Sequence, residues 1–151
     1  MYYFSYGMNT NPYQMSWRCP TAVDLGRASL PDFRFEFKRH ATIDDASGGI
    51  VDGVLWKITE TDEESLDILE GYPNYYTKKM VKVWSFEECR QVEAMTYMMF
   101  NHEKLMEPDR SYFDMVKEGY MEHDIPIRQL IYAINRVKET NNDYSFDTSI
   151  Y

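Results

Sequence analysis

Residues 75–100, YYTKKMVKVWSFEECRQVEAMTYMMF, decide the fold class of this chain. Apolar, β-branched and aromatic side chains are frequent in both halves, and the polar segment EECRQ at 87–91 separates them. This pattern predicts two antiparallel strands joined by a turn, so we expect a β-hairpin over residues 76–100. An antiparallel sheet is therefore the expected centre of the fold.

Strand patterns also precede the hairpin. Residues 2–6, YYFSY, predict a buried aromatic strand at the start of the chain. From 23 to 43 we expect strands interrupted by Gly26 and Pro31, because phenylalanines alternate with charged residues in the second half. A glycine-rich turn then leads into a strand over residues 51–58.

Capping signals predict two helices in the first half of the chain. Thr61 stands three residues before Glu64, a capping-box pattern that predicts a helix over 62–70, and Gly71 is placed to end it. A shorter helix is expected over residues 11–18, because an asparagine and a proline at its start can cap and begin a helix.

Two further helices are expected after the hairpin. One begins at Pro108 and Asp109 and the last begins at Pro126, each followed by apolar residues at helical spacing. We therefore expect a single α+β domain over residues 1–138, with a mostly antiparallel sheet and helices beside it. The polar residues 139–151 predict a loosely ordered tail.

The composition narrows the class of function. A formal net charge of -9 argues against nucleic acid or an anionic membrane as the main partner. No apolar run approaches the roughly 20 residues of a membrane-spanning helix. The two cysteines and three histidines lack metal-site spacing, so we expect neither a metal nor a cofactor. We expect a cytoplasmic protein that binds a small molecule.

Glu70 has a distinctive setting among the 25 acidic residues, since it lies at the last turn of an expected helix, just before Gly71. Helix carbonyls carry partial negative charge at that end, so the pKa of this carboxyl should rise. A carboxylate with a raised pKa is a better base near neutral pH. The alternative, from position alone, is an exposed helix end with no chemical role.

A second candidate site is the turn Tyr6-Gly7-Met8-Asn9 that follows the first strand. Consecutive backbone N–H groups in a glycine-containing turn can form a concave nest that binds a carboxylate. The side chain of Asn9 can donate or accept a hydrogen bond. The alternative is an ordinary turn from a strand into a loop, and spacing alone does not decide between the two.

These motifs follow one another in an order that resembles the gamma-glutamylcyclotransferase-like family. They are YGMN at 6–9, GVLW at 53–56, LDILEG at 66–71, VKV at 81–83, TYM at 96–98, PDRSY at 108–112 and DIP at 124–126. Each motif is short, but their shared order makes the resemblance specific. It covers about residues 2–135.

The resemblance implies a small mixed, mostly antiparallel β-barrel flanked by helices, with a cleft for a γ-glutamyl or 5-oxoproline moiety. It also implies that Glu70 is the acid and base in a reaction that releases 5-oxoproline from a γ-glutamyl amine, dipeptide or related small molecule. The residues to which substrate contacts carry over are Tyr6, Gly7, Met8, Asn9 and Tyr76, with Tyr75 as the adjacent alternative.

Met8 departs from the family pattern, because serine is usual at this position. Methionine cannot supply the hydrogen bond of a serine hydroxyl, although backbone contacts need no particular side chain. The leading interpretation is a cyclotransferase. The alternatives are a non-catalytic protein that binds or sequesters a small molecule in the same cleft, and a protein-interaction module.

Overall fold

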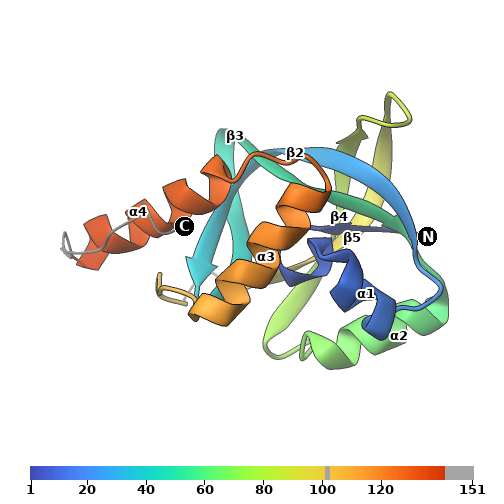
Figure 1. Ribbon diagram of the computed structural model, residues 1–151, viewed down its shortest axis with the longest axis horizontal. Coiled ribbons are helices and arrows are strands. Elements are labelled where there is room, and N and C mark those ends of the chain that lie inside the picture. Colours follow the sequence, from blue (N-terminus) through green and yellow to red (C-terminus); the bar gives the residue numbers. More distant parts are fainter. Residues whose placement is uncertain (101–102, 142–151) are drawn as a thin grey trace.

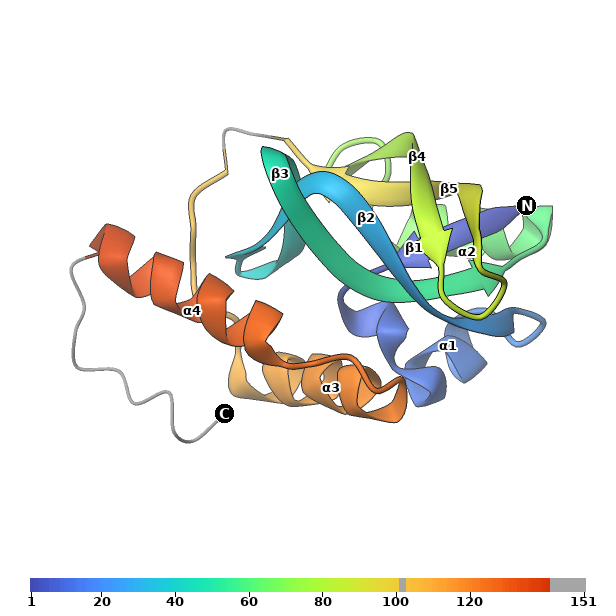
Figure 2. The same cartoon turned by 90° about the horizontal axis from the view of Figure 1, so that it is seen from above.

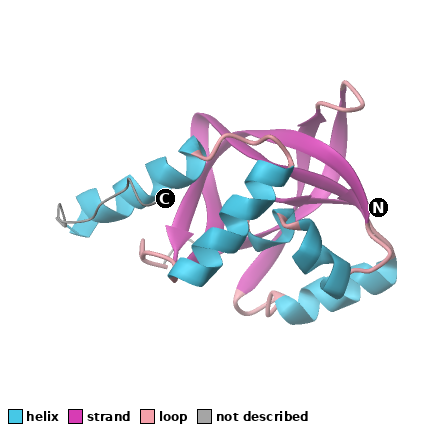
Figure 3. Cartoon of the chain, viewed as in Figure 1, coloured by secondary structure: helices cyan, strands magenta, loops and turns pink. Residues whose placement is uncertain are grey.

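The computed structural model describes residues 1–100 and 103–141, which form a closed five-stranded barrel with helices beside it (Figure 1, Figure 3). The strands are β1 (Tyr2–Ser5), β2 (Val23–Lys38), β3 (His40–Lys57), β4 (Tyr76–Ser85) and β5 (Arg90–Met99). The helices are η1 (Met8–Thr10), α1 (Pro12–Arg18), α2 (Glu60–Leu69), α3 (Arg110–Glu122) and α4 (Arg128–Asn141). The expected α+β class is confirmed.

The strand order around the barrel is β1-β3-β2-β4-β5. Four neighbouring pairs are antiparallel, and β1 meets β5 in parallel, so the barrel is mixed and mostly antiparallel as expected. The hairpin predicted over 76–100 is confirmed, because β4 and β5 pair from Tyr76 with Met99 to Ser85 with Arg90.

The prediction of a glycine-rich turn before residue 51 is wrong. β3 is a single strand from His40 to Lys57 whose pairing with β2 shifts register between Asp45 and Ile50, and the turn that joins β2 to β3 lies at Arg39, which has a φ of 72°. A Cβ at Gly49 would lie 2.4 Å from the backbone oxygen of Phe33, so glycine here permits close approach of the two strands. β2 likewise continues past Gly26 and Pro31, with a shift of register near each instead of an end.

The capping box of α2 lies two residues earlier than expected. The hydroxyl of Thr59 accepts a hydrogen bond from the backbone N–H of Asp62 (3.2 Å), and the Asp62 carboxylate accepts one from the N–H of Thr59 (3.0 Å). The helix therefore begins at Glu60, and Thr61 lies in its first turn instead of capping it. Gly71 follows the helix with a φ of 64°, as expected for a residue that ends it.

Figure 2 shows α1, α3 and α4 together on one side of the barrel. Asn11 caps α1 as expected, because its side chain accepts hydrogen bonds from the first amides of the helix. α3 and α4 begin at Arg110 and Arg128, within two residues of the expected starts. The core continues from the barrel into α3, where Phe37 and Phe113 pack with ring centroids 6.0 Å apart.

No helix in the described part of the chain is long and apolar enough to cross a membrane. The tail predicted over 139–151 lies mostly outside the described residues, which end at 141. Residues 139–141 belong to α4, so the helix extends three residues beyond the expected domain boundary.

Candidate active site

One cavity of about 240 Å³ collects the candidate residues from three separate parts of the sequence. The turn before η1 and η1 itself form one wall, the end of α2 supplies a carboxyl group, and the start of β4 supplies tyrosines. The candidates that line it are Tyr6, Gly7, Met8, Asn9, Glu70, Tyr75 and Tyr76.

The carboxyl group of Glu70 is placed by the way in which α2 ends. The backbone N–H of Glu70 donates to the carbonyl of Leu66 (2.8 Å), and Gly71 then leaves the helix with a positive φ. The N–H of Tyr72 returns to the carbonyl of Asp67 (2.9 Å), which closes a Schellman motif. This local geometry leaves the Glu70 side chain in the wall of the cavity.

The pKa of the Glu70 carboxyl is raised from its ordinary value to about 7, mainly because burial penalises the charged form. The guanidinium of Arg18 acts in the opposite direction and favours the charged form. The rise expected from the sequence therefore occurs, but its main cause is burial in the cavity instead of the helix carbonyls. A carboxyl with this pKa can accept and return a proton near neutral pH.

Asn9 links Glu70 to the rest of the cavity wall. Its side-chain nitrogen donates to Glu70 Oε1 (3.3 Å) and to the hydroxyl of Tyr3 (3.0 Å). Its side-chain oxygen accepts a hydrogen bond from Arg18 (2.6 Å), at the last turn of α1. Asn9 is buried, so these contacts fix the orientation of its amide and hold it against the carboxyl.

The turn at Gly7 needs glycine because of its neighbours. A Cβ at this position would lie 2.9 Å from the Cβ of Ala41 and 3.3 Å from the hydroxyl of Tyr112. The first hydrogen bond of η1 runs from the N–H of Thr10 to the carbonyl of Gly7 (3.1 Å). The amides of residues 8 and 9 lie ahead of this bond, so the turn itself does not use them.

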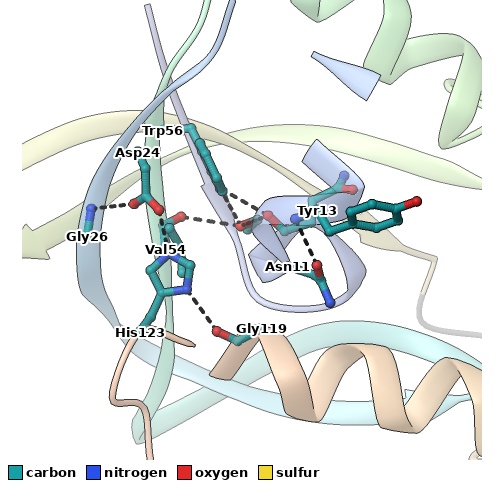
Figure 4. A network of polar contacts seen from close by, with 10 residues as sticks. Asn11, Tyr13, Asp24, Gly26, Val54, Trp56, Gly119 and His123 are labelled. Carbon is teal, nitrogen blue, oxygen red and sulfur yellow. Dashed lines mark hydrogen bonds and ion pairs between the residues drawn. The ribbon is translucent and has the colours of Figure 1, made fainter. Parts of the chain in front are cut away.

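Polar contacts behind the turn hold it against the barrel (Figure 4). The indole N–H of Trp56, on β3, donates to the carbonyl of Asn9 (3.0 Å) and to the hydroxyl of Ser5 (3.0 Å). The ring of His123, at the end of α3, stands edge-on to that of Trp56 and contacts Asp24 through Nε2 (2.6 Å). The backbone of η1 is thus fixed by groups outside the cavity.

Six tyrosines line the cavity and surround the carboxyl group. The hydroxyl of Tyr76 donates to the carbonyl of Ala41 (2.7 Å), and the N–H of Ala41 donates to the hydroxyl of Tyr112 (2.9 Å). Burial raises the pKa of the Tyr76 and Tyr112 hydroxyls, so both are neutral. The six are Tyr3, Tyr6, Tyr75, Tyr76, Tyr97 and Tyr112. The structure therefore places a single carboxyl group among neutral hydroxyls.

Sequence reasoning missed several residues of this lining, above all Arg18 and His40. His40 contacts the hydroxyl of Tyr75 through Nδ1 (2.7 Å). The 13 tyrosines of the chain were a signal for an aromatic lining, but not for which of them line it. Within the described residues, no group of three or more histidine, cysteine or acidic side chains is placed to hold a metal ion.

Comparison with curated proteins finds relatives that are all named gamma-glutamylcyclotransferase. Human gamma-glutamylcyclotransferase is 30% identical over 138 residues, which are 83% of this chain and 72% of the human protein. The bovine gamma-glutamylcyclotransferase is 28% identical over 137 residues, with the same shares of the two chains. The similarity thus extends through most of both proteins.

Solved structures give the same result for the fold. A gamma-glutamyl cyclotransferase superposes with a TM-score of 0.76 and 28% identity, covering 91% of this chain and 86% of its own. YkqA from Bacillus subtilis superposes with a TM-score of 0.74 at 19% identity, covering 91% of this chain and 54% of its own. At that identity the second likeness shows the fold alone.

A family model connects these likenesses. The model described as gamma-glutamyl cyclotransferase, AIG2-like matches residues 3–119, which include β1 from its second residue, all of β2 to β5 and the candidate residues around the cavity. The chain therefore belongs to the gamma-glutamyl cyclotransferase, AIG2-like family and is an enzyme of that family.

Proposed function

We propose that the protein is a cyclotransferase that releases 5-oxoproline from a γ-glutamyl amine or dipeptide, with Glu70 as acid and base. The observation that carries this proposal is the Glu70 carboxyl, which lines a tyrosine-rich cavity and has a pKa raised to about 7. The relatives named gamma-glutamylcyclotransferase support the class of reaction.

The first half of the reaction is a proton transfer followed by ring closure. A γ-glutamyl compound carries an α-ammonium group, which is not a nucleophile until it loses a proton. The Glu70 carboxylate takes that proton, and the free amine attacks the γ-carbonyl carbon of the same molecule. Since nucleophile and electrophile belong to one chain held in a bent conformation, closure of the five-membered lactam gains from proximity.

The second half breaks the original amide bond. The α-nitrogen gives up a second proton as it becomes the lactam N–H, and the leaving nitrogen gains two protons in all as it departs as an ammonium ion. One carboxyl can carry each proton in turn, because a group with a pKa near 7 both accepts and donates at neutral pH. Glu70 then returns to its starting state.

The turn before η1 is the proposed site for the anionic part of the substrate. The amides of Met8 and Asn9 precede the first hydrogen bond of η1, and the guanidinium of Arg18 adds positive charge to the same wall. An α-carboxylate or the oxygen of the tetrahedral intermediate would be stabilised by donors arranged in advance. Met8 contributes only its backbone to such binding, since its side chain has no hydroxyl.

The test is an assay of the purified protein with a panel of γ-glutamyl amines and dipeptides, measuring 5-oxoproline by mass spectrometry. We expect turnover of at least one member, and its loss in Glu70→Gln, which keeps the shape of the side chain but cannot exchange the proton. Glu64→Gln is the matched control, because Glu64 is an exposed acid on the same helix.

Two results would overturn the proposal. Turnover that survives in Glu70→Gln would remove Glu70 from the mechanism. Saturable binding of γ-glutamyl compounds by the wild type without any 5-oxoproline would favour the non-catalytic binding protein, for which the methionine at position 8 is the motivating feature. Calorimetry on the same panel distinguishes these outcomes.

A further inference from the structure

A second cavity, of about 360 Å³, lies between α4 and the outer face of β2 and β3. It shares no lining residue with the cavity at Glu70. Figure 2 shows α4 running beside these two long strands. The proposed cyclotransferase reaction does not use this cavity, and the sequence analysis did not identify it.

Four of the eight arginines in the chain line this cavity. They are Arg27 and Arg34 from β2, and Arg128 and Arg136 from α4. The whole chain carries a formal net charge of -9, so this concentration of positive charge is opposite in sign to the protein around it. Arginine keeps its charge at every physiological pH and binds oxyanions through two parallel N–H donors.

The protein neutralises only part of this charge. Asp52 pairs with Arg27 (3.0 Å). Glu36 is shared between Arg34 (2.5 Å) and Arg136 (3.3 Å). Four guanidinium groups therefore face two carboxylates, and Arg128 has no ion pair or hydrogen bond with any residue in 1–100 or 103–141. The excess of two positive charges matches a doubly charged anion.

A further donor in the cluster lacks an acceptor. Nε of Arg27 is buried and has no hydrogen-bond partner within the described residues. A buried donor without an acceptor costs free energy, and nearly all such groups in folded proteins are paired. The chain therefore leaves one donor of the Arg27 guanidinium without an acceptor, in addition to the unpaired charge of the cluster.

The walls of the cavity are fixed in advance. At the start of α4, the side chain of Gln129 accepts from the N–H of Asp52 (2.8 Å) and donates to its carbonyl (3.0 Å). Two turns later, Arg136 donates to the carbonyl of Phe35 (2.5 Å). α4 is thus held to the barrel at both ends of the cavity, so a ligand would not have to order these walls itself.

Apolar side chains stand beside the arginines. Phe86, Ile50 and Tyr132 line the cavity and are exposed by 46%, 65% and 57%. The guanidinium of Arg27 lies over the ring of Phe86, 5.0 Å from its centroid. Aromatic faces next to an anion site suit a ligand that has a flat ring as well as an anionic group.

We propose that this cavity binds a small organic phosphate, with the phosphate held by the arginines and a flat ring against Phe86 and Tyr132. A phosphate monoester carries close to two negative charges at neutral pH, which matches the unpaired charge of the cluster. The strongly acidic remainder of the surface disfavours a polyanion such as nucleic acid, whereas a small ligand meets only the cavity.

The experiment is calorimetric titration of the full chain with phenyl phosphate, inorganic phosphate and phenol. We expect phenyl phosphate to bind, inorganic phosphate to bind about tenfold more weakly because it lacks the ring, and phenol not to bind. Arg128→Gln and Arg34→Gln should each weaken phenyl phosphate binding by about tenfold or more. The matched control is Arg110→Gln, whose arginine is exposed and paired with Asp114 on α3.

Variants also separate this cavity from the one at Glu70. Glu70→Gln should bind phenyl phosphate as the wild type does, because the two cavities have no lining residue in common. Arg128 is exposed and unpaired within the described chain, so its replacement leaves folding intact, which circular dichroism checks. Absence of saturable binding, or equal loss in Arg110→Gln and Arg128→Gln, would overturn the proposal.

Discussion

The cavity at Glu70 holds one carboxyl group among neutral tyrosine hydroxyls, whereas the cavity beside α4 holds four arginines and excess positive charge. The ionisable groups in the two places differ in kind. At Glu70 burial raises the pKa to about 7, so the group can be found with or without its proton near neutral pH. A guanidinium group keeps its charge at every physiological pH.

This difference suits the cavity at Glu70 to catalysis and the cavity beside α4 to ligand binding. A group that titrates near neutral pH can take up and release a proton during turnover, as the cyclotransferase reaction requires. Permanently charged guanidinium groups cannot serve as a base, but they hold an oxyanion without changing their own state. One barrel therefore presents a site suited to proton transfer and a site suited to anion binding on different surfaces.

The substitution Glu70→Gln should affect only the first of the two cavities, and we expect the largest effect from it. Turnover of the best γ-glutamyl substrate should fall by about 10²- to 10⁴-fold, because the proposed general acid and base is lost. Phenyl phosphate binding should not change. Steady-state rates and calorimetry on the same preparation measure both, and a change in binding would show that the two cavities are coupled.

The second prediction concerns the glycine in the wall of the Glu70 cavity. Gly7→Ala should lower the free energy of unfolding by about 1 to 3 kcal/mol, because the added methyl group would lie 2.9 Å from the Cβ of Ala41, which cannot rotate away. Chemical denaturation measures the change. Ser65→Ala, at an exposed position of α2, is the control, and an unchanged stability in Gly7→Ala would show that the turn yields without cost.

Much of the fold was predictable because its signals are local. The alternating strands and the polar turn at 87–91 need only neighbouring residues to be recognised, and the β4–β5 hairpin follows them. The longest strand, β3, was not predicted in full because its glycines suggest a turn. In the structure the absence of a side chain at Gly49 lets the backbone of Phe33, on β2, approach closely. This contact cannot be recognised from the sequence of β3 alone.

The start of α2 shows how a pattern can be ambiguous. Thr59 and Thr61 both stand three residues before an acid, and both are consistent with a capping box. The structure uses Thr59, because β3 ends at Lys57 and the chain turns into the helix immediately afterwards. Sequence spacing identifies the type of cap, while the preceding strand decides its position.

The residues of the candidate site that lie in a sequence motif could be predicted, and those that reach the site only through packing could not. Glu70 and the turn at Gly7 lie in recognisable stretches, and the structure places both at one cavity. Arg18 has no such signal, since it reaches Asn9 only through the packing of α1 beside η1. The second cavity combines two strands, a turn and α4, so no single stretch of sequence could show it.

Arg18→Gln tests how the guanidinium of Arg18 affects the pKa of Glu70, and we expect a smaller effect from it. In the wild type, kcat/KM should rise with pH through about 7, because Glu70 must lose its proton before it can act as the proposed base. Removing Arg18 should raise the pKa of Glu70 further, so the midpoint should move to higher pH, by less than about one unit. A pH–rate profile measures it, and Arg110→Gln should leave the midpoint in place.

We expect the smallest effect from the substitution of His123, which lies behind the cavity at Glu70. Burial opposes a charge on its ring, but hydrogen bonds to Asp24 and to the carbonyl of Gly119 raise its pKa above the ordinary value of about 6.5. Since the folded-state pKa is raised, the stabilisation is fully present below the ordinary value and is lost as pH rises through the folded-state value.

His123→Gln should therefore lower the free energy of unfolding by about 1 kcal/mol at mildly acidic pH, and by less in alkaline solution. The pKa of Asp24 is lowered by its hydrogen bonds from His123 and Gly26, although burial opposes this, so its carboxylate stays charged in mild acid. Denaturation curves at several pH values measure the difference between the two proteins. A difference that does not vary with pH would mean that His123 contributes by packing against Trp56 and not by its charge.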